Sequence, residues 1–198
     1  MSSRLRVLLV LAVAALGSAV GTYTWAAYVA TTENSDNTIA SGTVTLSDND
    51  SGGSLVSLSN AMPGSTDTGC IRVRYAGSLA ANVRLYGTTT GSGLDRYLDV
   101  TVTRGVYSPS TPSFDSCTDF QPDGTDYIGA GAGVIYNGTL ENFPDNWSTG
   151  LVDPTAGSPE SWGTDEVHVY RVTVTLQNDI AAESLSATQT FTWEARNL

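Results

Sequence analysis

The sequence predicts an all-β protein, an antiparallel β-sandwich or jelly roll that forms a single domain with long loops. Apolar and polar residues alternate in many short segments after residue 26, and the intervals are rich in Gly, Pro, Asn and Asp. No stretch keeps a helical period for more than about two turns. The 198 residues suffice for one domain and are too few for two well-cored domains.

The N-terminus has the three parts of a secretory signal peptide. Arg4 and Arg6 precede the apolar run Val7–Leu16, and small residues stand at Thr24 and Ala26. We therefore expect residues 1–26 to be removed by cleavage between Ala26 and Ala27. The apolar run is shorter than the roughly 20 residues that a spanning helix needs, so the processed chain should keep no stable membrane span. An uncleaved anchor is the alternative.

Six segments carry the alternation and are expected to be strands: 43–46, 71–75, 83–85, 98–103, 168–176 and 188–194. The longest places His168 and Tyr170 on the same face as Val172, Val174 and Leu176, with Arg171, Thr173 and Thr175 opposite. Each pattern is typical of a strand with one dry face and one wet face.

Segments rich in residues that break strands separate these six: 48–53, 62–64, 87–93, 129–133 and 153–163. We expect turns or loops there. The region 108–166 is the least regular, and long loops with one or two short strands are predicted for it.

The two cysteines, Cys70 and Cys117, are predicted to form a disulfide. They are too far apart for a metal knuckle, no Cys-x-x-Cys is present, and an export signal precedes them. Two free buried thiols are the alternative.

The charge of the chain disfavours two classes of partner. Nine arginines, no lysine and twenty acidic residues give a formal net charge of -11. After loss of residues 1–26 the chain has seven arginines against twenty acidic residues, a formal net charge of -13. Such a surface repels phosphate backbones and anionic lipids, so nucleic acid is not an expected partner.

The sequence nominates no catalytic residue, no cofactor and no metal ligand set. His168 is the one histidine, whereas zinc sites draw on several His or Cys ligands and a serine triad also needs a histidine. We expect His168 to be a core residue with its polar atoms satisfied. Asp48-Asn49-Asp50 offers oxygen ligands for calcium but lacks EF-hand spacing, so a turn is expected. Asn137 and Asn146 begin N-glycosylation patterns.

Five segments, in order, resemble the TasA/camelysin family of extracellular proteins: Gly21–Tyr28, Thr38–Leu46, Leu58–Gly64, Tyr75–Ala80 and Ala187–Ala195. The first is similar to the end of that family's signal peptide, which a dedicated signal peptidase reads. The second is similar to its first strand, and the last to its closing strand.

The resemblance implies a secreted subunit that polymerises with itself into biofilm-matrix or pilus-like fibres, with accessory matrix proteins as further partners. The domain would span 41–198. The segment 27–40 would donate a strand to a neighbouring subunit, through Ala27, Tyr28, Val29, Ala30, Thr31 and Thr32. A frayed terminus is the alternative for this segment. A monomeric camelysin-like protease or an extracellular binding module is the alternative for the chain.

Overall fold

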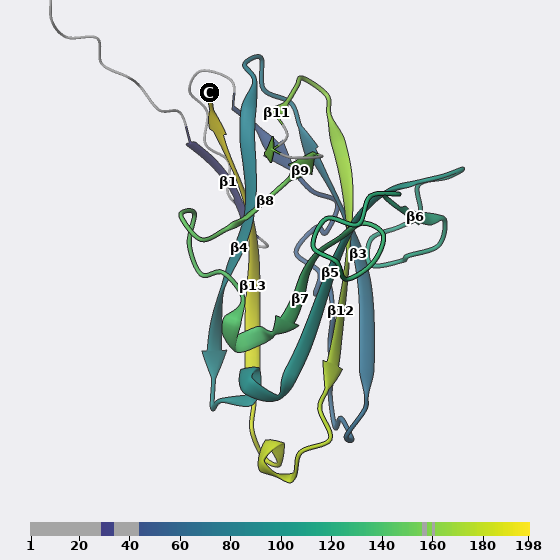
Figure 1. Ribbon diagram of the computed structural model, residues 1–198, viewed down its shortest axis with the longest axis vertical. Coiled ribbons are helices and arrows are strands. Elements are labelled where there is room, and N and C mark those ends of the chain that lie inside the picture. The colour runs from purple at the N-terminus through teal and green to yellow at the C-terminus, as the bar shows by residue number, and fades with distance from the viewer. Residues whose placement is uncertain (1–28, 34–43, 156–157, 160) are drawn as a thin grey trace, which may run out of the picture.

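A computed structural model describes residues 29–33, 44–155, 158–159 and 161–198. Two antiparallel sheets lie face to face, with their long strands along the longest axis of the molecule (Figure 1). The helical elements in the described ranges are three short 3-10 turns: η1 (Leu94–Tyr97), η2 (Leu140–Asn142) and η3 (Ile180–Ala182). The predicted all-β, sandwich-like class is confirmed. The predicted signal peptide and its cleavage site lie outside the described residues.

We call the sheet that contains the C-terminal strand sheet A. Its strands run in the order β1 (Val29–Glu33), β13 (Ala187–Asn197), β4 (Ala81–Gly91) and β11 (Ser161–Trp162), and β8 (Leu151–Val152) also pairs with β4. All of these pairings are antiparallel.

The opposite sheet is sheet B. Its strands run in the order β2 (Leu46–Ser47), β3 (Thr66–Tyr75), β12 (Val167–Leu176), β5 (Leu98–Tyr107) and β6 (Phe120–Pro122), and β7 (Val134–Thr139) also pairs with β5. A separate hairpin consists of β9 (Pro154–Thr155) and β10 (Ser158–Pro159).

The core lies between the sheets and follows the predicted alternation. Sheet A contributes Val83, Leu85, Phe191, Trp193 and Ala195; sheet B contributes Ile71, Val73, Tyr75, Val100, Val102, Tyr170, Val172 and Val174. Because successive side chains of a strand point to opposite faces, this period-2 pattern is sufficient to build both inner faces. His168 is buried on the predicted face of β12.

Two sequence-based expectations for the loops are wrong. The composition of 87–93 predicts a turn, but β4 continues through Gly91. At Gly87 an added Cβ would lie 2.2 Å from the carbonyl oxygen of Thr190 on β13, so glycine permits close strand approach there and marks no break. The region 108–166 holds β6 to β11 rather than one or two short strands, because long strands of both sheets give these segments edges to pair with.

The predicted disulfide between Cys70 and Cys117 is present, with 5.1 Å between the Cα atoms. Cys70 lies on the outer face of β3, and the backbone N–H of Cys70 donates to the carbonyl oxygen of Asp115. Cys70, Phe120 and Val169 form a second small apolar cluster outside the main core. The disulfide thus anchors the 108–119 loop to the outside of sheet B.

Replacing both cysteines by serine (C70S/C117S) should lower the free energy of unfolding by about 2–4 kcal/mol, because the closed loop of the unfolded chain is released. Urea denaturation of the variant and the parent measures this. A Ser113→Ala variant in the same loop is the control. Equal midpoints for the parent and the double variant would contradict the prediction.

Candidate functional site

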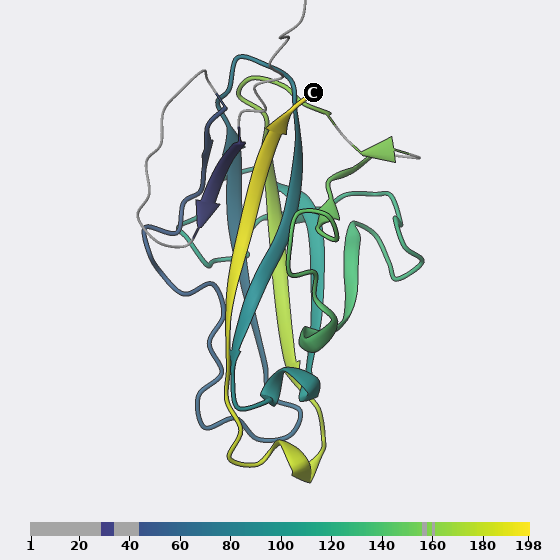
Figure 2. The same cartoon turned by 90° about the vertical axis from the view of Figure 1, so that its left-hand side faces the viewer.

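The first candidate site is the edge of sheet A where β1 lies. β1 pairs with β13 through five residue pairs, from Val29 opposite Arg196 to Glu33 opposite Thr192. In the described part of the chain β13 is its one strand partner, and Figure 2 shows it as a short outermost strand beside the long β13. The strand that the sequence nominated as a donor therefore occupies an edge position in its own chain.

The same edge of β13 continues beyond β1. Within the described ranges, no strand pairs with residues 187–191 on the side opposite β4. A cavity of about 300 Å³ adjoins this stretch; Leu55, Val56, Ile71, Val174, Phe191 and Trp193 are among the residues that line it. The Nε1–H group of Trp193 is buried and has no hydrogen-bond partner in the described structure. Half of the edge thus adjoins an apolar cavity and has no strand partner in the described part of the chain.

The segment Ser54–Leu58 forms the outer wall of this cavity. It lies directly against β3, since a Cβ at Gly69 would be 1.9 Å from the carbonyl oxygen of Leu55. The backbone N–H of Ser57 donates to the carboxylate of Asp67 at the start of β3. The lack of a side chain at Gly69 therefore allows this wall to pack directly on sheet B.

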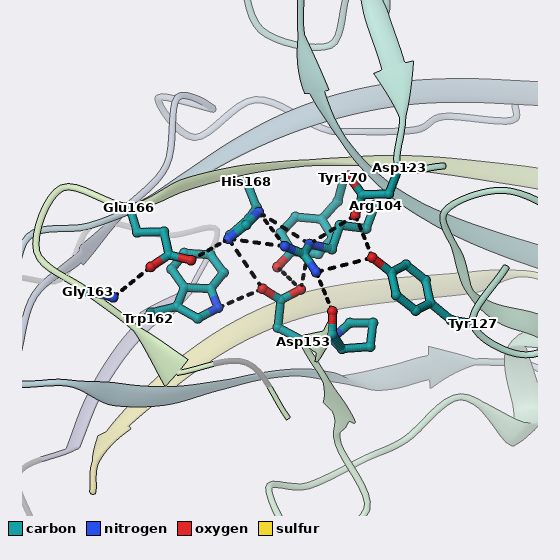
Figure 3. Close-up of polar contacts among 10 residues, drawn as sticks. Arg104, Asp123, Tyr127, Asp153, Trp162, Gly163, Glu166, His168 and Tyr170 are labelled. Atoms are coloured by element: carbon teal, nitrogen blue, oxygen red, sulfur yellow. Dashed lines mark hydrogen bonds and ion pairs between the residues drawn. The ribbon is translucent and has the colours of Figure 1, made fainter. Parts of the chain in front are cut away.

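The second candidate is a cluster of charged side chains inside the sandwich (Figure 3). Arg104 of β5 has a side chain that is 7% exposed, and Asp153, between β8 and β9, has one that is 2% exposed. The Nε atom of Arg104 lies 3.2 Å from Oδ1 of Asp153 and 3.3 Å from Oδ2 of Asp123. The Asp153 carboxylate also accepts hydrogen bonds from Trp162 Nε1 (2.6 Å) and from the Tyr170 hydroxyl (3.2 Å).

His168 completes the cluster, and its contacts define its tautomer. Arg104 Nε donates to His168 Nδ1 at 3.2 Å, and a guanidinium has no acceptor, so Nδ1 carries no proton. The Nε2–H group then donates to Oε1 of Glu166 at 2.9 Å. The ring also packs edge-on against Trp162, with 4.5 Å between centroids. His168 is a buried core residue with satisfied polar atoms, as the sequence predicted.

One phenol lies at the rim of this cluster. The Tyr127 hydroxyl donates to Asp123 at 2.9 Å. Burial, and then this hydrogen bond, raise the pKa of Tyr127 above its ordinary value. The Tyr127 hydroxyl therefore stays protonated and can donate its hydrogen bond to Asp123.

The cluster ties the irregular region to the sandwich. Asp153 and Trp162 come from the segment that carries β8 and β11, whereas Arg104, His168 and Tyr170 come from sheet B. β8 and β11 cover the outer edge of β4 at Leu85–Arg84 and Asn82–Ala81. The buried charged side chains point at one another (Figure 3). Arg104, Asp153 and His168 line neither the cavity beside β13 nor a second cavity at η3. The cluster therefore holds β8 and β11 against the outer edge of β4, so this edge of sheet A is covered.

The other sequence-nominated residues lie partly in the first candidate site and partly outside both candidates. Val29, Ala30, Thr31 and Thr32 form most of β1, whereas Ala26, Ala27 and Tyr28 lie outside the described residues. Asp48-Asn49-Asp50 forms a turn, in which the Asp50 carboxylate accepts from the N–H of Gly52 at 2.8 Å. Asn137 is exposed on β7, and Asn146 is exposed in the loop before β8. In the described ranges, no group of three or more His, Cys, Asp or Glu side chains is arranged to hold a metal ion.

Sequence reasoning missed Arg104, Asp153 and Trp162. A signal for Arg104 existed, because it continues the inward positions Leu98, Val100 and Val102 of β5. No sequence spacing links it to Asp153, which lies 49 positions further along the chain.

The chain matches no protein-family model and no curated protein. None of the described helices is long and apolar enough to cross a membrane.

Proposed function

We propose that this protein is a secreted structural subunit, a jelly roll of the TasA/camelysin type, which polymerises into extracellular fibres by exchanging β1 between copies. In the fibre, β1 of one subunit pairs with β13 of the next in the register that it has here within one chain. The signal-like N-terminus and the disulfide support export.

The position of β1 carries the proposal. A strand of five residues with one partner strand can leave without breaking any other strand pair, because β13 remains paired with β4 along its whole length. The vacated edge would present N–H and C=O groups that a strand from a second copy satisfies equally well. The contacts that β1 makes with β13 are then nearly the same within one chain and between two chains. This similarity is the condition for strand exchange.

The chain between β1 and the domain is long enough for this exchange. Ten residues, 34–43, separate Glu33 from Val44. At about 3.3–3.6 Å per residue, an extended segment of this length spans roughly 35 Å. That distance allows β1 to reach a neighbouring subunit while its own domain stays folded.

The unpaired half of the β13 edge favours a longer inserted strand in the fibre. In the register of β1, a donor that extends past Glu33 would pair residues 34–38 with residues 187–191 and satisfy backbone groups along this edge.

Cysteines placed across the β1–β13 pair test the exchange directly. Val29 and Arg196 are register partners, and opposed residues in antiparallel strands have Cα atoms about 4.5–5.5 Å apart, within the range that a disulfide bridges. In V29C/R196C, oxidation of the soluble monomer should close a bond within the chain. Oxidation after fibre growth should instead give a covalent ladder of dimers, trimers and longer species on non-reducing gels.

The pair V29C/T188C is the matched control, because Thr188 lies on the same strand but is not opposite Val29. It should give no ladder. Fibres of V29C/R196C that contain only intramolecular bonds would contradict strand exchange, and wild-type protein that forms no fibres would contradict the fibre function itself.

A further inference from the structure

The tripeptide Asn146-Trp147-Ser148 matches the N-glycosylation pattern and lies in the loop between η2 and β8 (Figure 1). Asn146 and Ser148 are exposed, whereas Trp147 is half-buried. An enzyme that reads this pattern has to reach the side-chain amide of the asparagine and the hydroxyl two residues later. Both groups lie at the surface, so the fold leaves this acceptor pattern accessible.

The loop holds these two groups in contact with each other. Oδ1 of Asn146 accepts hydrogen bonds from the backbone N–H of Ser148, at 2.9 Å, and from the Ser148 hydroxyl. This arrangement is an Asx turn, in which the asparagine side chain takes the place of a backbone carbonyl. Nδ2 of Asn146 donates to the neighbouring Asp145 carboxylate. The amide and the hydroxyl are therefore presented together, on one turn.

Two arginines fix this loop on the outer face of sheet A. The guanidinium carbons of Arg84 and Arg196 lie 5.0 Å and 4.3 Å from the centre of the Trp147 ring, which makes two cation–π contacts. Nη1 of Arg84 also donates to the carbonyl oxygens of Trp147, at 2.9 Å, and Ser148, at 3.1 Å. Because the middle residue of the pattern is anchored, the turn at Asn146 keeps its shape in the folded chain.

The second pattern, Asn137-Gly138-Thr139, lies within strand β7. Asn137 is the register partner of Thr101 on β5, and its Oδ1 atom accepts from the Thr101 hydroxyl at 3.2 Å. The Thr139 hydroxyl oxygen accepts from Nδ2 of Asn142 at 2.8 Å. Both side chains of the pattern are thus engaged with neighbours, and the backbone is fixed in a ladder. The folded chain can present this segment as a turn only by breaking the pairing of β7 with β5.

We propose that Asn146 carries an N-linked glycan, attached to the folded chain, and that Asn137 is left unmodified. In the transfer step, Nδ2 of Asn146 loses a proton to a base of the enzyme and forms a bond to the anomeric carbon of a lipid-linked oligosaccharide. The bond between that carbon and the phosphate oxygen of the lipid breaks, and the lipid phosphate leaves with the electron pair. The inference rests on the proposed export and is independent of fibre growth.

The test incubates the folded chain that begins at Ala27 with an oligosaccharyltransferase and a lipid-linked oligosaccharide, and then examines each site by mass spectrometry. A protease that cleaves after glutamate separates the two patterns, because Glu141 lies between them and Glu160 is the next glutamate. We expect the mass of one glycan on the fragment 142–160 and no glycan on the fragment that contains Asn137. Fibre growth enters none of these measurements, so a failure of the fibre function leaves their outcome unchanged.

Variants and a peptide control this result. Ser148→Ala removes the hydroxyl and should abolish the modification, whereas Ser148→Thr should retain it. A synthetic peptide of residues 134–142, which is free of β5, should be modified at Asn137 by the same enzyme. A folded chain without a glycan on 142–160, a glycan on Asn137 in the folded chain, or modification that persists in Ser148→Ala would overturn the proposal. A peptide that stays unmodified would overturn the protection of Asn137 by strand pairing.

Discussion

Deleting residues 27–37 from the chain that begins at Ala27 should abolish fibre growth and leave a folded, soluble monomer. The strand β1 is lost, but β13 keeps its full pairing with β4, and sheet B does not contact β13 through strand pairing. We expect the free energy of unfolding of the monomer to fall by about 1–3 kcal/mol, the ordinary range for the loss of a peripheral contact. Analytical ultracentrifugation, electron microscopy and urea denaturation measure the three outcomes.

A variant in which residues 27–37 are replaced by a Gly/Ser segment of equal length separates strand pairing from chain length, and it should also fail to polymerise. A synthetic peptide of residues 27–37 should slow growth of the intact chain, because it occupies the β13 edge of the last subunit. If the truncated chain grows fibres as fast as the intact one, β1 is not the connector and another edge must join the subunits.

The Arg104→Met variant should be strongly destabilised, with a free energy of unfolding that falls by about 3–5 kcal/mol. Methionine keeps much of the buried length of the side chain but removes the positive charge. The buried carboxylate of Asp153 and that of Asp123 are then left without the guanidinium, and His168 Nδ1 loses its donor. Leaving a buried charge uncompensated costs far more than the ion pair itself contributes.

The matched control is Arg74→Met, which breaks an exposed ion pair with Asp165. Such pairs contribute about 0–1 kcal/mol, so the control should stay close to the parent in urea denaturation. If the free energy of unfolding of Arg104→Met falls by less than about 1 kcal/mol, the cluster does not contribute to holding the two sheets together. Limited proteolysis offers a second readout, because release of the Asp153–Trp162 segment should expose new cleavage sites there.

The fold class followed from local pattern, and the errors have physical causes. The alternation in 168–176 and 98–103 predicted the inward faces correctly, because each strand meets the core on that side. On the outer faces Thr103 and Val169 are nevertheless buried, and Val169 packs with Cys70 and Phe120. The pattern misled at Gly87–Gly91, where glycine allows two backbones to approach closely and sequence shows only a residue that often ends strands. It was uninformative over 108–166, because short edge strands depend on which long strand lies beside them.

Residue order and composition were enough to predict an acidic, all-β chain with an export signal and one disulfide, and the family resemblance implied a donor segment. These properties rest on residues close together in the chain or on simple counts. The folded chain added that Val29–Glu33 lies at the edge of β13 and that Arg104 meets Asp153 inside the sandwich. It also added that half of this edge adjoins a cavity and has no strand partner among the described residues. Strand order and cross-sheet contacts are set by long-range packing, so no local period encodes them.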